Sequence, residues 1–165
     1  MIKSFQIVIP ARLESTRLEK KLLKEINGQS IIERTWKRCL ESAASKVVIA
    51  TDSTEIYDLI VSLGGDCFLS KETHESGTDR IHEFVESSNI SEDSLIINVQ
   101  ADEPLIDINS INELAKFMAS NNYEYVTLCK KLADEEDLDD PNKVKVVFDG
   151  KGKALYFSRS RMLAN

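Results

Sequence analysis

Residues 5–21 read FQIVIPARLESTRLEKK, an apolar run that breaks at a proline and continues into a cation-rich segment. A run of Ile, Val and Phe bounded by proline is typical of a central strand in a parallel sheet. The cations that follow this predicted strand are Arg12, Arg17, Lys20 and Lys21. They lie at its carboxyl end, where open α/β sheets bind ligands, and clustered cations there suit a phosphate chain. The alternative is a solvated surface loop with incidental charge, and position alone leaves both interpretations open.

The composition narrows the class of protein. The chain has 165 residues, 42% of them hydrophobic and 30% charged, with a net charge of -7. This length and composition predict one soluble globular domain over residues 1–165. The acidic balance disfavours nucleic-acid binding, which needs a basic face. Since no apolar run is long enough for a membrane span and no signal-peptide pattern precedes the first strand, we expect a cytoplasmic protein with no membrane partner.

Three cysteines, Cys39, Cys67 and Cys129, lie far apart, each within an apolar pattern. Their number and spacing match neither a disulfide framework nor a metal site. The sequence therefore predicts three reduced core cysteines.

Strands and helices alternate along the whole chain. Strands are predicted over residues 4–9, 46–50, 66–69, 94–99 and 125–129. Helices are predicted over 30–43 and 78–88, along the apolar stripes 56–63 and 108–118, and a hairpin joins 144–148 to 155–157. The acidic residues 133–142 are expected to form an exposed connection. This alternation predicts an α/β fold with a doubly wound, mostly parallel sheet.

A second strand end carries a carboxylate. Residues 96–104 read IINVQADEP, so we expect Asp102 to project over the same edge as Arg12 and Lys21. A carboxylate there can hold Mg²⁺, which needs one or two protein oxygens besides phosphates and water. The alternative is that Asp102 or Asp107 caps the following helix. The neighbouring cations favour the metal role for Asp102.

A third motif, residues 74–80, reads HESGTDR. Ser76 with Asp79 forms a capping box at a helix start, and a glycine between hydroxyls also exposes backbone N–H groups to a ligand. Both roles can hold together. Taken alone, His74 is interpreted as a surface histidine, since no partnered Ser or Cys nucleophile is evident.

The strand end at residues 50–52 is less informative. We expect Asp52, with Glu55, to cap the next helix, and a ligand contact is the weaker alternative. No G-x-G-x-x-G or G-x-x-x-x-G-K-[ST] motif is present, which disfavours a dinucleotide site and a P-loop NTPase. Phosphates would therefore be held by Arg and Lys side chains with a carboxylate-bound metal, a combination that suits nucleotidyl transfer better than hydride transfer.

These motifs resemble the 3-deoxy-manno-octulosonate (KDO) cytidylyltransferase family, also called CMP-KDO synthetases. The matching segments run in order along nearly the whole chain: 9–12, 15–18, Lys21, 26–28, 50–52, 74–80, 98–104, 141–142, 144–147 and 154–159. Such an ordered series is far more specific than any single motif.

The resemblance implies a nucleotide-diphospho-sugar-transferase-like, Rossmann-like fold and the reaction of CTP with KDO to give CMP-KDO and pyrophosphate, with Mg²⁺. It implies that Arg12 and Lys21 bind the triphosphate and that Asp102 holds the metal, these three being the catalytic residues. The further implied binding residues are Ala11, Ser76, Gly77, Thr78, Arg80 and Gln100, with Arg159 on the sugar-acid side. It also implies a cytoplasmic enzyme, usually a homodimer, that supplies the inner-core sugar of lipopolysaccharide.

Three features depart from the family pattern. Glu19-Lys20 precedes Lys21 where the family usually has Pro-Gly, which stiffens the loop and adds a negative charge; we expect Lys20 to compensate in part. Ala101 stands where the family usually has Gly, which would crowd a close backbone approach. The chain also ends before the family's second metal-binding aspartate and its dimerising segments, so we expect a C-terminally shortened domain.

Other functions remain in competition. One is a cytidylyltransferase for another acidic sugar, for example a sialic-acid-like one. Another is a truncated nucleotide-binding module without turnover. A dinucleotide-dependent oxidoreductase is disfavoured by the missing glycine motif.

Overall fold

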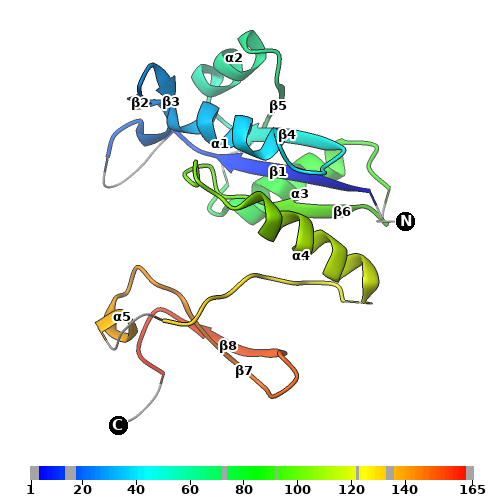
Figure 1. The fold of residues 1–165 in the computed structure, drawn as a ribbon. Coiled ribbons are helices and arrows are strands. Elements are labelled where there is room, and N and C mark those ends of the chain that lie inside the picture. Colours follow the sequence, from blue (N-terminus) through cyan, green and yellow to red (C-terminus); the bar gives the residue numbers. More distant parts are fainter. Residues whose placement is uncertain are drawn as a thin grey trace. The chain divides into compact units, whose positions relative to one another are not determined.

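The computed structural model describes residues 4–13, 18–71, 74–91, 93–121, 123–132 and 136–162. By their contacts these fall into two compact units, Met1–Val126 and Thr127–Asn165 (Figure 1). The prediction of a single domain over residues 1–165 depends on how the two units pack together, and it stays a prediction.

The first unit is built on a parallel sheet of four strands. These are β1 (Phe5–Ala11), β4 (Lys46–Thr51), β5 (Asp66–Leu69) and β6 (Leu95–Asn98). Their order in the sheet is β5-β4-β1-β6, and every pair is parallel. The chain thus starts in the middle of the sheet, adds strands on one side and then crosses to the other. This order confirms the predicted doubly wound parallel sheet.

Helices cover both faces of this sheet. They are α1 (Ile31–Leu40), α2 (Thr54–Ser62), α3 (Gly77–Ser87) and α4 (Ile108–Ser120). Ile7 and Ile9 of β1 pack in one core cluster with residues of α1, α2 and α4, whereas Val8 packs in a second cluster with Ile81 and Phe84 of α3 (Figure 1). Because successive side chains of a strand point to opposite faces, the buried apolar run 7–11 of β1 is what a strand with two covered faces requires.

The helix starts follow side-chain capping rules, with one correction. Ser30 caps α1 and Ser76 caps α3, as predicted, and Asp107 caps α4. The predicted cap at Asp52 is wrong, since the side chain of Ser53 accepts the hydrogen bond at the start of α2. A cap oxygen must face the first free N–H groups of its helix, and the carboxylate of Asp52 is instead paired elsewhere, as described below.

Two short elements were missed from the sequence. A small antiparallel pair, β2 (Glu25–Ile26) and β3 (Gln29–Ser30), turns at Asn27 and Gly28, whose φ angles are +52° and +74°. Asn-Gly is the preferred pair for such a tight hairpin turn, so this signal was available. A single turn of 3-10 helix, η1 (Lys21–Leu23), precedes it.

The second unit contains an antiparallel hairpin, β7 (Lys145–Phe148) with β8 (Ala154–Ser158), which confirms the predicted one. A short helix, α5 (Glu136–Asp139), lies within the predicted exposed connection, and residues 133–135 lie outside the described residues. The strand predicted over 125–129 is wrong, because these residues have no strand partner among the described residues. A strand-like composition does not form a strand without a neighbour to hydrogen-bond to.

The cysteines differ in burial. Cys39 is buried, Cys67 is half-buried and Cys129 is exposed, so the prediction of a core position is wrong for Cys129, which lies in the unpaired segment. Burial raises the pKa values of the Cys39 and Cys67 thiols to about 12. Both thiols are therefore protonated and unreactive at neutral pH.

Within the described ranges, every helix is too short or too polar to cross a membrane.

Candidate functional site

The loops that follow β1, β4 and β6 meet at one edge of the sheet. The three strands are parallel, so their carboxyl ends lie on the same side, where ligands bind in open α/β sheets. Ala11, the last residue of β1, is buried and pairs with Thr51 of β4. The side chains that follow these strand ends form the candidate site.

Lys21 and Asp102 contact each other at this edge. Lys21 begins η1, and the next residue, Leu22, is buried in the core. Lys21 Nζ donates to Asp102 Oδ2 at 2.5 Å, and the two side chains are 40% and 44% exposed. The prediction that Asp102 shares an edge with Lys21 is confirmed, and the half-exposed pair leaves both groups accessible to a ligand.

Arg12 follows β1 directly and is exposed. Its guanidinium makes no hydrogen bond or ion pair with any other described residue, so it is available to an anion. The predicted contact of Arg17 falls on residues 14–17, which lie outside the described residues.

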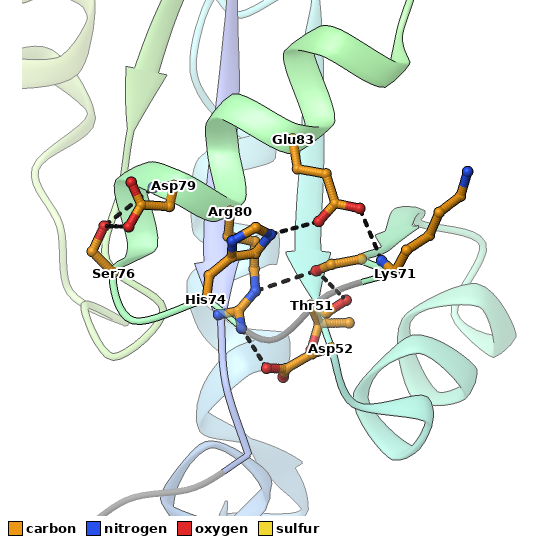
Figure 2. A network of polar contacts seen from close by, with 9 residues as sticks. Thr51, Asp52, Lys71, His74, Ser76, Asp79, Arg80 and Glu83 are labelled. Atoms are coloured by element: carbon orange, nitrogen blue, oxygen red, sulfur yellow. Dashed lines mark hydrogen bonds and ion pairs between the residues drawn. The ribbon is translucent and has the colours of Figure 1, made fainter.

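The start of α3 lies against the end of β1. A Cβ on Gly77 would come within 3.0 Å of Pro10 Cγ and 3.2 Å of Pro10 Cβ, so the glycine allows this approach. Ser76 Oγ accepts from the Asp79 N–H at 3.1 Å and donates to Asp79 Oδ2 at 2.7 Å (Figure 2). The predicted cap is therefore confirmed. Thr78 is exposed, and its predicted ligand contact stays a prediction.

Arg80 has a different environment from the other cations. Its side chain is only 2% exposed, and its guanidinium forms an ion pair with Asp52. Arg80 Nε also donates to Ser70 Oγ at 3.3 Å. Figure 2 shows the side chain reaching from α3 towards the end of β4. A buried guanidinium needs a charged partner, which explains why Asp52 is paired rather than capping α2. The predicted nucleotide contact of Arg80 stays a prediction.

His74 is part of the same network rather than a free surface histidine. Its Nε2 lies 2.6 Å from Glu83 Oε2, and both side chains are mostly buried (Figure 2). Glu83 Oε1 also accepts from the Lys71 N–H at 2.8 Å. These hydrogen bonds, that from His74 first, lower the pKa of Glu83. The network joins the segment before α3 to the helix itself.

Gln100 and Arg159 complete the predicted set. Gln100 is exposed, and its side-chain amide donates to Asn98 Oδ1 at 3.5 Å. Arg159 belongs to the second unit, where Arg159 Nη1 donates to the Pro141 carbonyl at 3.0 Å. Its predicted place on the sugar-acid side stays a prediction.

The two substitutions relative to the family pattern have clear structural consequences. Lys20 Nζ donates to both carboxylate oxygens of Glu55, at 2.7 and 2.8 Å. Lys20 is thus paired with Glu55 in this structure, and the expectation that it compensates for Glu19 near phosphate stays a prediction. Ala101 is 6% exposed and packs in the core, so its methyl group does not crowd the exposed edge.

The carboxylate of Asp102 is a suitable ligand for a magnesium ion that arrives with a nucleotide. Among the described residues, no three His, Cys, Asp or Glu side chains gather as a metal-binding group. Mg²⁺ usually takes only one or two carboxylates, with phosphates and water completing its shell. Asp102, half-exposed beside Lys21, supplies such a carboxylate. Asp102 therefore fits the protein's share of such a metal site.

The fold and its edge define a class: a doubly wound α/β protein whose candidate site offers cationic side chains and a carboxylate, with no glycine-rich phosphate-binding motif in the sequence. A family model described as "Cytidylyltransferase" matches residues 6–165. The chain therefore belongs to the cytidylyltransferase family.

Individual relatives agree with this assignment. The chain is 44% identical over 158 residues to the 3-deoxy-manno-octulosonate cytidylyltransferase of Francisella tularensis subsp. novicida (strain U112). It is 43% identical over 156 residues to 3-deoxy-manno-octulosonate cytidylyltransferase 2 of Actinobacillus pleuropneumoniae serotype 5b (strain L20). Among solved structures, it is similar to CMP:2-keto-3-deoxy-manno-octonic acid synthetase complexed with CTP, with a TM-score of 0.81 and 31% identity.

The matches cover nearly all of this chain but only part of each relative. They include 95% and 94% of this chain in the two sequence comparisons, and 97% in the structural one. The chain spans 63% and 62% of the two curated relatives and 65% of the solved chain.

Proposed function

We propose that this chain contributes the nucleotide site of a KDO cytidylyltransferase, which converts CTP and KDO to CMP-KDO and pyrophosphate. The observation that carries the proposal is the contact between Lys21 and Asp102 at the carboxyl edge of the sheet, with Arg12 exposed at the end of the adjoining strand. Relatives up to 44% identical are KDO cytidylyltransferases, which supports the substrate class.

Arg12 and Lys21 would bind the triphosphate. Their charges stand out on a chain with a net charge of -7, so they create a local attraction for an anion. Charge-assisted hydrogen bonds to phosphate are stronger than neutral ones, and a guanidinium can bind two phosphate oxygens at once. The start of α3, held against Pro10 by Gly77, would add backbone N–H groups close by.

Asp102 would hold a magnesium ion, which when bound offsets negative charge on the phosphate oxygens. In this structure the Lys21 ammonium neutralises Asp102. Lys21 would leave the carboxylate for a phosphate when the nucleotide binds, since both Lys21 and the metal carry positive charge and compete for the same oxygen.

The proposed chemistry needs positioning more than a reactive side chain. The anomeric hydroxyl of the sugar attacks the α-phosphorus of CTP, the new O–P bond forms, and the bond to the pyrophosphate oxygen breaks. The hydroxyl proton passes to solvent. Arg12 and Lys21 stabilise charge on the phosphate oxygens and keep the reacting groups aligned, which are the main contributions in phosphoryl-type transfer.

The wider biological role is proposed from the family resemblance. It comprises the use of Mg²⁺, a place for Arg159 on the sugar-acid side, a cytoplasmic homodimer, and supply of KDO for lipopolysaccharide. Light scattering during size exclusion tests the dimer, which a monomer mass at micromolar concentration would contradict.

The test of the function is pyrophosphate release from CTP, with KDO and with other sugar acids, together with CTP titration with and without Mg²⁺. We expect release with KDO that depends on Mg²⁺. Release only with another acid would assign a different sugar, and CTP binding without release would indicate a nucleotide-binding module.

The Asp102→Ala variant tests the metal role. We expect turnover to fall by about 10²–10³-fold, as when one charge-stabilising group is removed from a site of this kind, with little change in the melting temperature. Glu113→Ala is the matched control, because Glu113 is an exposed carboxylate on α4, paired with Lys116. Full Mg²⁺-dependent activity in Asp102→Ala would overturn the metal assignment.

A further inference from the structure

We propose that Lys20 and Glu55 are positioning residues, which hold the loop formed by residues 18–24 so that Lys21 faces the nucleotide. The inference rests on the proposed function, in which Lys21 binds the triphosphate of CTP. It assigns Lys20 a structural partner rather than a phosphate.

The first support is the geometry of the pair. Lys20 Nζ lies 2.7 Å from Glu55 Oε1 and 2.8 Å from Glu55 Oε2, so one ammonium binds both carboxylate oxygens. Glu55 lies in the first turn of α2, directly after β4. The ion pair therefore connects the loop of residues 18–24 to α2, the helix that follows the neighbouring strand.

The second support is the backbone of Lys20. Its φ is +49° and its ψ is +37°, in the left-handed region, which residues with a side chain disfavour. Such a conformation persists only when surrounding contacts hold it in place. The ion pair with Glu55 on one side and the buried Leu22 on the other are contacts of this kind.

The third support is that the neighbouring residues Lys20 and Lys21 bind partners on opposite sides of β1. Lys20 is bound to Glu55 after β4, and Lys21 is bound to Asp102 after β6. In the sheet, β4 and β6 lie on opposite sides of β1. In this structure the loop is thus attached to both neighbours of the strand it follows, and the contact of Lys20 with Glu55 remains to position Lys21 when Lys21 leaves Asp102 for a phosphate.

A direct phosphate role for Lys20 predicts the opposite effect at Glu55. If Lys20 were a phosphate ligand, removing the charge of Glu55 would free its ammonium and tighten CTP binding. If the pair positions the loop, the same change loosens the loop and weakens binding. The sign of the effect distinguishes the two roles.

The experiment compares Glu55→Gln with Asp58→Asn. Asp58 is exposed on the same helix, so the control makes the same change of charge without touching the loop. Calorimetric titration with CTP and Mg²⁺ should show binding weakened about two- to fivefold in Glu55→Gln, the range that an exposed ion pair supports. Asp58→Asn should bind as the wild type does. Equal or tighter binding by Glu55→Gln, or equal weakening in the control, would overturn the positioning role.

Two further measurements keep the role separate from general stability. Lys20→Arg should retain CTP affinity, because a guanidinium can also bind both carboxylate oxygens, whereas Lys20→Met should lose it to the same extent as Glu55→Gln. In amide hydrogen exchange, the N–H groups of Leu23 and Lys24, which donate to the carbonyls of Lys20 and Lys21, should exchange faster in Glu55→Gln only. The melting temperatures should agree.

The outcomes separate this inference from the proposed function. If the wild-type chain binds no CTP, the proposed function is overturned and the positioning role with it. The wild type can instead bind CTP while the expected results fail in the Glu55→Gln titration, the Lys20 titrations and the hydrogen exchange. In that case only the positioning role is overturned.

Discussion

Two regions of the same sheet edge use ion pairs in different ways. At the start of α3, Arg80 is almost fully buried against Asp52, and His74 and Glu83 are mostly buried beside it. In the loop after β1, the pairs of Lys20 and Lys21 are about half-exposed. A buried charge that loses its partner is costly, while an exposed one is rehydrated at little cost. The buried network therefore suits a fixed frame, and the exposed pair of Lys21 with Asp102 suits exchange with a ligand.

The largest expected effect on stability comes from breaking the buried network. Arg80→Met leaves the Asp52 carboxylate without its partner, and we expect a loss of about 3 kcal/mol in the free energy of unfolding, measured by urea denaturation. Arg12→Met is the matched control at the exposed region: it should lose CTP affinity but less than about 0.5 kcal/mol of stability. A similar stability loss in both variants would remove the distinction between the two regions.

The next effect concerns the contact that brings α3 to β1. Gly77→Ala places a methyl group about 3.0 Å from Pro10 Cγ, and we expect a loss of about 1–2 kcal/mol from overpacking. Gly150→Ala is a suitable control, since a Cβ there meets nothing within 4 Å. Thermal unfolding of both variants measures the difference, and equal melting temperatures would show that α3 adjusts without strain.

The pH dependence of stability tests the hydrogen bonds of Glu83. Its pKa is lowered in the folded protein, so ionised Glu83 stabilises the fold above the ordinary glutamate value of 4.5 and this contribution is lost as the pH falls through the folded pKa. Glu83→Gln should therefore be less stable than the wild type near neutral pH, by about 1 kcal/mol. The difference should shrink as the pH falls below 4.5, and a difference independent of pH would contradict the assignment.

The smallest expected effect lies in the exposed region. Lys20→Gly removes an unfavourable left-handed conformation of a residue with a side chain, but it also removes an exposed ion pair and adds freedom to the unfolded chain. These contributions oppose one another, and we expect a net change below about 0.5 kcal/mol. Urea denaturation measures it. A loss above about 1.5 kcal/mol would mean that the loop is part of the fixed frame.

Much of the fold could be predicted because the signals are local. The strand Asp66–Leu69 has the predicted bounds, and Ser30 and Ser76 cap the helices that they were expected to cap. Periodicity and capping depend on residues within a few positions of one another. Residues 125–129 show the limit of such signals: their composition suits a strand, but no partner strand lies beside them among the described residues.

The candidate site was predicted in part. The shared edge of Lys21 and Asp102 follows from strand order, because parallel strands that alternate with helices end on the same side. Two ion pairs were not predicted, Asp52 with Arg80 and Glu55 with Lys20. The local sequence favoured Asp52 and Glu55 as helix-capping residues and Lys20 as a cation near phosphate.

The sequence by itself thus determined the doubly wound sheet, the starts of α1 and α3 and the set of charged residues at the carboxyl edge, because these depend on local patterns and on chain order. Only the tertiary structure decided which charge pairs with which. Lys20 and Glu55 are 35 positions apart, and Lys21 and Asp102 are 81 apart. Ion pairing depends on distance in space and on burial, and neither is encoded in the local sequence around a single lysine.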